Sequence, residues 1–178
     1  ARQEALGVSP LPPADRATWL RRATYDLTGL PPTVDEITDF LADEASDARE
    51  RVVERLLTSP AYGERWGRHW LDVARYADTA GDAGDFPIPE AWRYRNWVIV
   101  AIAEDMPYDT FIVRQIAGDL VPAETQDERD ANRIATGYLA LSKRFGQNPR
   151  DFVHTLDDTV DNLGKAFKDL CFGVGHLC

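Results

Sequence analysis

Apolar residues recur at steps of three and four along nearly the whole chain, and no strand-like alternation of apolar and polar residues persists. The spacing of Leu20, Ala23 and Leu27 predicts a first helix, and Asp15 is placed to cap its start. Gly29 and the prolines at 31–32 follow directly, and they do not continue a helix. The pattern therefore predicts helices separated by short breaks.

Capping patterns mark the start of the next helices. Thr33 and Glu36 form a capping box ahead of a second helix, because each side chain can bond the backbone of the other residue. Ser46 is a candidate cap for a third helix. The pair Ser59-Pro60 places proline at the first position of a fourth helix, where its missing N–H does no harm.

The second half of the chain continues this alternation of helices and breaks. Loops are predicted over 80–89 and 119–127, and the segment FGQNP forms a further break. Helices are predicted over about 90–104, 109–117 and 128–144. A last helix carries a narrow apolar row that favours packing along one neighbour, formed by Val153, Leu156, Val160, Leu163, Phe167 and Leu170.

Composition and charge agree with a folded helical protein. Five Trp, six Tyr and seven Phe among 178 residues are too many aromatic residues for a disordered chain. The net charge of −10 argues against nucleic acid or anionic lipid as a partner, and it suits either a basic partner or solubility alone. The longest apolar run, at 97–103, is far shorter than the ~20 residues that span a bilayer. We predict an all-α fold, a compact bundle of about seven or eight helices with irregular loops, in one domain over 1–178 cut from a longer precursor.

The stretch YGERWGRHWLDVARYADT, residues 62–79, concentrates aromatic and charged residues in about four turns of helix. Its apolar residues at steps of four and three predict one buried face, formed by Tyr62, Trp66, Trp70 and Val73. Its charged residues at steps of four predict a ladder of surface ion pairs, formed by Glu64, Arg68 and Asp72.

His69 and Asp72 are the catalytic candidates of this stretch. They lie three residues apart and so are neighbours on one helix. A carboxylate beside a histidine orients the ring and raises its pKa, as a general base requires. A structural hydrogen bond uses the same spacing, and no serine or cysteine nucleophile stands nearby in the sequence. Both interpretations stay open.

Asp78, Asp82 and Asp85 are candidate metal ligands in and beside the loop at 80–89. Calcium binds several hard oxygen ligands supplied by a loop. The spacing of these residues is not that of an EF-hand, and Asp-Gly pairs are also common in solvated turns. The alternatives are a metal site and a solvated loop.

The segment WRYRNW, residues 92–97, interleaves aromatic and arginine side chains. Arg93, Tyr94 and Arg95 are candidate binding residues, because such a segment can stack on and hold a sugar, a carboxylate or a porphyrin propionate. The structural alternative is that the arginines pair with carboxylates. Candidate partners for such pairs are Asp105, Asp109 and Asp119.

Five segments together resemble the cytochrome c-associated domain of planctomycete-type secreted proteins, a family of unknown function. They are DLTGLPPT (26–33), LLTSPAYGERWGRHWLDVARYADT (56–79), AWRYRNWVI (91–99), DMPYDTFIVRQIAGDL (105–120) and DNLGKAF (161–167). The resemblance runs from Ala1 to about Phe167. It implies export to the periplasm or cell surface, and a larger parent that often has a separate cytochrome-like domain and a second uncharacterised domain. It transfers no catalytic residues, because the family has none established.

Members of that family usually continue into a CARCHDH-type segment that resembles a c-type haem attachment. The corresponding end here is LCFGVGHLC, which has Cys171, His176 and Cys178 but lacks the C-x-x-C-H order. We therefore expect no covalent haem c in this chain and assign no cofactor. A disulfide between the two cysteines would close a short loop and stabilise little, and their spacing matches no zinc pair.

Two functions follow as hypotheses. The first is a non-catalytic exported helical module that docks to a cytochrome c-type protein or domain, or scaffolds a larger membrane-associated redox complex, respiratory or photosynthetic. The alternative is an extracellular enzyme acting on a polysaccharide with His69, Asp72 and the acids of 78–85, because carboxylates can hydrolyse glycosidic bonds. A concave pocket shared by His69, Asp72 and Arg93 would favour the enzyme.

Overall fold

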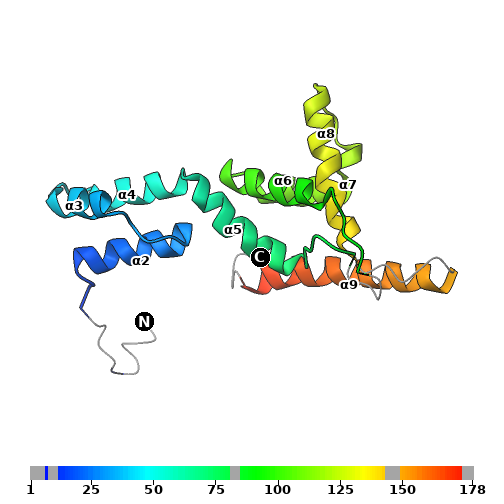
Figure 1. Cartoon of the computed structure of the whole chain (residues 1–178), viewed down its shortest axis with the longest axis horizontal. Helices are drawn as coiled ribbons and strands as arrows, with labels where there is room; N and C mark the ends of the chain where they lie inside the picture. The colour runs from blue at the N-terminus through cyan, green and yellow to red at the C-terminus, as the bar shows by residue number, and fades with distance from the viewer. Residues whose placement is uncertain (1–6, 8–11, 81–84, 143–148, 174–178) are drawn as a thin grey trace. The chain divides into compact units, whose positions relative to one another are not determined.

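The computed structural model describes residue 7 and residues 12–80, 85–142 and 149–173, the side chains of 149–151 and 168–173 excepted. These residues form eight α-helices and two 3-10 helices (Figure 1), and an isolated bridge pairs Thr79 with Pro87. The predicted all-α fold is confirmed. The chain divides into two compact units, residues 1–62 and residues 63–178. The single domain expected over 1–178 stays a prediction.

The first unit contains α2 (Arg16–Thr28), α3 (Val34–Ala42) and α4 (Ala48–Leu57). The Asp15 carboxylate caps α2 by accepting a bond of 2.9 Å from the Thr18 N–H. Gly29 ends this helix in the left-handed region with φ 72°, which glycine adopts without steric cost. The capping box of Thr33 and Glu36 is present at the start of α3. These predictions are confirmed.

The core of the first unit lies between its three helices. Its buried side chains are Leu20, Phe40, Ala48, Val52 and Leu56. Ser46 is not the cap of α4, because the helix begins one residue later than that prediction requires, after Asp47. The Asp47 carboxylate accepts from the Arg51 guanidinium at 2.7 Å and makes no capping bond to the backbone. The prediction of Ser46 was therefore wrong.

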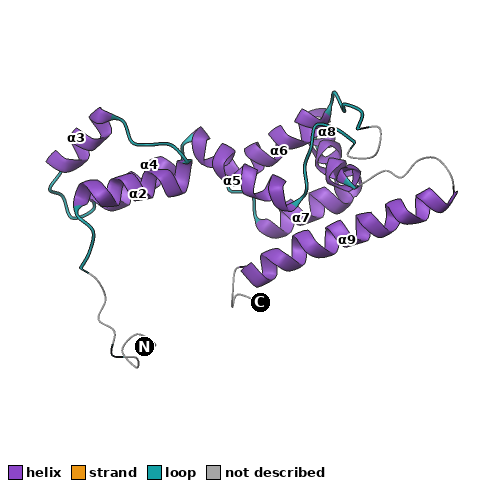
Figure 2. Ribbon diagram, turned by 60° about the horizontal axis from the view of Figure 1, so that its bottom comes forward, coloured by secondary structure: helices purple, strands orange, loops and turns teal. Residues whose placement is uncertain are grey.

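Most of the second unit is a cluster of helices around one aromatic core. The helix α5 (Pro60–Val73) begins at Pro60 as predicted and continues into this unit. The other elements are α6 (Ala91–Ala103), α7 (Tyr108–Ala117), η1 (Gly118–Leu120), α8 (Gln126–Ala135), η2 (Thr136–Leu141) and α9 (Pro149–Gly173). Figure 2 shows α9 as a single long rod.

The buried face of α5 differs from the predicted one. Trp70 is buried, but Trp66 and Val73 are 40% and 37% exposed. The helix instead turns Gly63 and Gly67 toward α6, where a Cβ on Gly63 would lie 2.8 Å from both the Ile99 carbonyl and the Ala103 Cβ. Small residues allow two helix backbones to approach closely, and this contact selects the face of α5 that enters the core. The full buried set of α5 and its end is Gly63, Gly67, Trp70, Leu71 and Ala74.

Two other predictions are corrected in part. The helix predicted over 128–144 is α-helical only to Ala135, and a 3-10 helix follows. Gly137 packs there against Tyr94, and a Cβ added to this glycine would lie only 3.2 Å from the Tyr94 Cβ, so tertiary packing overrides the local helix pattern. In α9, Leu163 and Phe167 pack on the core as expected, whereas Val153, Leu156 and Val160 are exposed. The Leu170 side chain is outside the described residues.

The lengths and the apolar content of the described helices show whether any of them could span a membrane. None of them combines the length and the apolar character that crossing a bilayer requires.

Candidate functional site

Three buried polar side chains meet at the centre of the second unit. Trp70 on α5 donates its indole N–H to the Tyr94 hydroxyl at 2.9 Å and to the Gln115 amide oxygen at 3.1 Å. Tyr94 on α6 donates its hydroxyl to the same Gln115 oxygen at 2.6 Å. The Gln115 amide NH₂ then donates to the Phe111 carbonyl at 3.0 Å. The three side chains therefore satisfy one another inside the core, which is the favourable arrangement for buried polar groups.

The side chains of this cluster are not placed to react with a substrate. Burial raises the pKa of the Tyr94 hydroxyl well above its ordinary value, so the residue stays a neutral hydrogen-bond donor at any physiological pH. Aromatic rings seal the cluster, since the Trp70 ring lies edge-on to Phe111 at 4.9 Å between centroids and 6.0 Å from Tyr138. A group that reacts needs access to a substrate, and these three side chains are all buried.

The tyrosines of this core give a prediction for alkaline pH. Burial, together with a hydrogen bond to Asp78, raises the pKa of Tyr76 to about 12, and burial raises that of Tyr138 to about 12. Their folded pKa values lie above the unfolded value of about 10, so their contribution to stability is complete below pH 10 and is lost as the pH rises through about 12. We expect phenolate absorbance of the native protein to show a late fraction near pH 12, which moves to about pH 10 in urea. Titration of every tyrosine near pH 10 with helicity intact would contradict this.

A second polar cluster joins the end of α5 to α9. Arg75 donates from Nε to the Asn162 amide oxygen at 3.2 Å, and its guanidinium reaches the Asp158 carboxylate at 3.4 Å. Asn162 is buried and donates its amide to the Ala74 carbonyl at 3.2 Å. The Asn162 carbonyl accepts from the Tyr138 hydroxyl at 3.2 Å. These bonds fasten α9 to the core at the point where α5 ends.

The backbone at Arg75 is unusual. Arg75 has φ 60°, the left-handed conformation that normally requires glycine, and the Tyr76 N–H bonds the Leu71 carbonyl at 2.9 Å in the manner of a helix C-terminal motif. The side chain at this position makes the bonds to α9 described above. The same side chain lines a cavity of about 180 Å³ whose other walls are Ala77, Thr79, Ala80, Ile88, Ala140, Leu141 and Asp158.

Substitutions at Arg75 separate the backbone effect from the side-chain effect. Arg75→Ala loses the bonds to α9 and keeps the left-handed strain, whereas Arg75→Gly loses the same bonds and relieves that strain. We expect the glycine variant to be more stable than the alanine variant by about 1 kcal/mol, measured by urea denaturation. Equal stability of the two variants, or a more stable alanine variant, would show that φ at this position carries no strain.

His69 and Asp72 are not joined to the buried clusters. His69 is exposed on α5, and its ring lies 5.3 Å from the Trp66 ring, measured between centroids. The Asp72 carboxylate is exposed and accepts from Arg68 Nε at 2.7 Å, which confirms one step of the expected ion ladder. Neither His69 nor Asp72 lines the cavity beside Arg75 or the pocket between α3 and α4. A catalytic role for His69 and Asp72 stays a prediction.

The aspartates of the loop at 80–89 are placed only in part. Asp78 accepts from the Tyr76 hydroxyl at 2.5 Å, Asp85 is exposed with φ 41°, and Asp82 lies outside the described residues. Backbone bonds close the neck of the loop, from the Ala80 N–H to the Phe86 carbonyl at 2.9 Å and from the Ile88 N–H to the Asp78 carbonyl at 2.8 Å. Within the described part of the chain, no group of three His, Cys, Asp or Glu residues is arranged to hold a metal ion.

The WRYRNW segment forms the start of α6. Arg93 pairs with Glu90, the residue just ahead of this helix, and not with the more distant aspartates that the sequence suggested. Arg95 Nε donates to the Asn96 amide oxygen at 3.4 Å. Tyr94 points into the core and makes the bonds described above. Arg93 is exposed, so the structure separates the arginine from the tyrosine within this segment.

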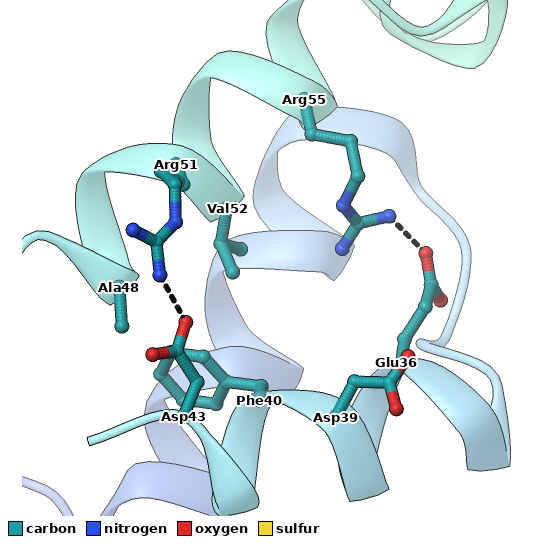
Figure 3. A pocket seen from close by; sticks show the side chains of 8 residues that line it. All are labelled: Glu36, Asp39, Phe40, Asp43, Ala48, Arg51, Val52 and Arg55. Carbon is teal, nitrogen blue, oxygen red and sulfur yellow. Dashed lines mark hydrogen bonds and ion pairs between the residues drawn. The ribbon is translucent and has the colours of Figure 1, made fainter. Parts of the chain in front are cut away.

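The first unit has a charged pocket of its own, between α3 and α4 (Figure 3). Its volume is about 300 Å³, and Phe40 and Val52 form part of its lining. Arg51 of α4 pairs with Asp43, and Arg55 of the same helix pairs with Glu36 (Figure 3).

Hydrogen bonds favour the ionised form of two carboxylates of this pocket, those of Glu36 and Asp43. Bonds from the Thr33 backbone N–H and then from Arg55 hold the pKa of Glu36 below its ordinary value. Bonds from the Ala45 N–H and then from Arg51 do the same for the pKa of Asp43. An incoming anion would have to displace these carboxylates from the arginines. The ion pairs that line the pocket therefore serve first to join α3 to α4.

Sequence reasoning missed Gln115 and Asn162, the polar residues that close the two buried clusters. Gln115 lies one turn after Phe111 and beside Ile116, so a polar amide on an apolar helix face is the signal that could have identified it. Asn162 has Asp158 and Lys165 about one turn away and gives no such signal. The Cys171 side chain and the residues His176 and Cys178 lie outside the described residues.

The family model PSCyt2, described as a protein of unknown function (DUF1549), matches residues 1–178. No curated protein and no solved structure matches the chain.

Proposed function

The chain belongs to the PSCyt2 family of proteins of unknown function, and we propose that it is a non-catalytic module that docks to a cytochrome-containing electron-transfer assembly. The single observation that carries this proposal is the closed cluster of Trp70, Tyr94 and Gln115. Its polar groups bond one another in the core of the second unit, which leaves the centre of the helices without a group poised for chemistry.

The surface supports docking in two ways. The chain carries a net charge of −10, so long-range attraction favours a partner of positive charge and raises its association rate. Large apolar side chains are also exposed on α9, where a partner could cover them. The resemblance to exported cytochrome c-associated domains makes a haem protein of the periplasm or cell surface the partner of choice. In this proposal the haem belongs to the partner.

The test is isolation of the chain with its partner. A tagged form of the full protein is produced in its native host, recovered from the extracytoplasmic fraction at low salt, and examined for a Soret band. We expect a haem protein to co-elute and to dissociate at about 0.5 M salt, because charge attraction between exposed groups is screened there. An isolate that contains no more haem than a mock isolation from cells without the tagged protein would overturn the proposal.

One observation favours the alternative enzyme. The exposed Trp66 ring stands beside the exposed His69 ring on α5, and an aromatic face of this kind can stack on a sugar. The enzyme hypothesis predicts release of reducing ends from a polysaccharide, and loss of this activity in His69→Ala with helicity unchanged. The docking hypothesis predicts no such activity in either protein.

A further inference from the structure

The apolar row of α9 is only half covered. Phe152, Leu156, Val160, Leu163 and Phe167 follow one another at steps of four, four, three and four, so they lie along one side of the helix. Leu163 and Phe167 pack against the core of the second unit, and the Phe167 ring lies 5.8 Å from that of Trp70. The row thus begins outside the core and ends in it.

The first half of the row is exposed to solvent. Phe152 and Val160 are 63% and 67% exposed, and Leu156 and the adjacent Val153 are about half exposed. Figure 2 shows the end of α9 that begins at Pro149 extending away from the other helices of the second unit. Four large apolar side chains on one helix face make a contiguous patch of the kind that marks a protein interface. We call Phe152, Val153, Leu156 and Val160 the α9 row.

The charged residues along the edge of the α9 row indicate which kind of partner covers it. Asp157 and Asp161 follow Val153 at steps of four and therefore lie along one edge of the α9 row. Both aspartates are exposed, and Asp161 is paired with Lys165 at 2.7 Å. A row of apolar side chains with carboxylates on its edge complements an amphipathic helix whose apolar face is bordered by lysine or arginine. A second copy of this chain would instead bring like charges together, with −10 on each molecule.

We propose that the α9 row is the docking surface of this protein and that its occupant is a basic amphipathic helix of the partner. This inference rests on the proposed function for the identity of the partner, but the surface and the charge of its occupant are properties of α9 alone. The helix would lie along α9 and cover Leu156 and Val160 while its cations face Asp157 and Asp161. Its apolar side chains would continue the packing that Leu163 and Phe167 make with the core.

The test uses the full chain and two synthetic helical peptides of about 18 residues, a length at which an isolated helix can form. Both peptides carry leucine at steps of three and four, and the residues bordering this face are lysine in one peptide and glutamate in the other. Fluorescence anisotropy of the labelled peptides measures binding. We expect the lysine peptide to bind at least about tenfold more tightly than the glutamate peptide, with an advantage that shrinks at high salt.

Three variants locate the surface. Leu156→Glu places a carboxylate within the apolar contact and is expected to weaken binding of the lysine peptide by about tenfold or more. Val100→Glu is the matched control, since Val100 is half exposed on α6 of the same unit, and it is expected to leave binding unchanged. Asp157→Lys leaves the apolar row intact and is expected to shift preference toward the glutamate peptide. Circular dichroism establishes that each variant keeps its helicity.

Three results would overturn this inference. The two peptides could bind equally, Leu156→Glu could leave binding of the lysine peptide unchanged, or analytical ultracentrifugation could show a dimer that Leu156→Glu abolishes. Recovery of the native haem protein separates it from the proposed function. Haem recovered with Leu156→Glu as fully as with the wild type overturns the surface and supports the cytochrome partner. Lysine-peptide binding through the α9 row, combined with native isolates that lack haem, supports the surface and overturns the cytochrome partner.

Discussion

Trp70→Ala is expected to lower the free energy of unfolding by about 3–5 kcal/mol, a large part of the 5–15 kcal/mol typical of a domain. The indole ring touches Phe111, Tyr138 and Phe167 across the core, so its removal leaves a cavity that rigid helices cannot close. The substitution also takes away the N–H that bonds Tyr94 and Gln115. Urea denaturation followed by circular dichroism measures the effect.

Trp66→Ala is the matched control for that prediction, because it removes the same side chain from the same helix. Trp66 is partly exposed, and we expect a loss within about 1 kcal/mol. Trp70→Phe gives an intermediate case, since it keeps one aromatic ring but loses the indole donor and part of the ring volume. Equal losses from Trp66→Ala and Trp70→Ala would mean that the core does not lie on the side of α5 described above.

Gly118→Ala is expected to destabilise the second unit by about 3 kcal/mol or more, although it adds a single methyl group. A Cβ at this position would lie 2.2 Å from the Asn132 carbonyl oxygen, far inside van der Waals contact. The clash is with backbone, so no side-chain rotation relieves it. The start of η1 and the middle of α8 would have to separate. Thermal and urea unfolding of the purified variant measure the loss.

Gly164→Ala is the control for the clash. Gly164 lies within α9, and a Cβ there meets no other atom within 4 Å. Alanine favours helical backbone over glycine by up to about 1 kcal/mol, so this variant is expected to be neutral or slightly more stable. A loss from Gly164→Ala as large as that from Gly118→Ala would contradict the placement of η1 against α8.

Local sequence signals predicted the starts of α2, α3 and α5 and the end of α2, because those signals act within a few residues. Asp15, Gly29 and the pair Thr33 and Glu36 perform the capping roles that their chemistry suggested. Pro60 begins α5 for the same reason. The prediction of Ser46 as a cap was wrong, since two adjacent residues could both serve and the chain places Asp47 there.

Packing between helices was harder to predict. The aromatic spacing in α5 suggested that Trp66 is buried, but the contact of Gly63 and Gly67 with α6 rotates another face inward. Periodicity shows which faces of a helix are apolar enough to be buried, and only the neighbouring helix decides which of them is buried. The same limit applies to α9. Its apolar row was recognised from the sequence, while the exposure of its first half depends on where the core ends.

The long-range partners of the candidate site residues could not be predicted from the sequence, because residue types were recognised there without the groups that they contact. Tyr94 was grouped with Arg93 and Arg95 in a binding segment, and its actual partner Gln115 is far away in the sequence. Likewise, Arg75 drew no attention, although its φ of 60° and its bonds to α9 set it apart in the structure. Long-range hydrogen bonds of this kind leave no local pattern.

Amide hydrogen exchange on the isolated chain and on its haem-containing complex tests the central claim most directly, namely that the central helices are closed and that partners bind on α9. The account predicts slower exchange on complex formation in the first half of α9, around residues 152–160, with no change in α5 and the start of α6. Slower exchange around His69, Asp72 and Arg93, with α9 unaffected, would contradict it and would place the functional surface on the other side of the same core.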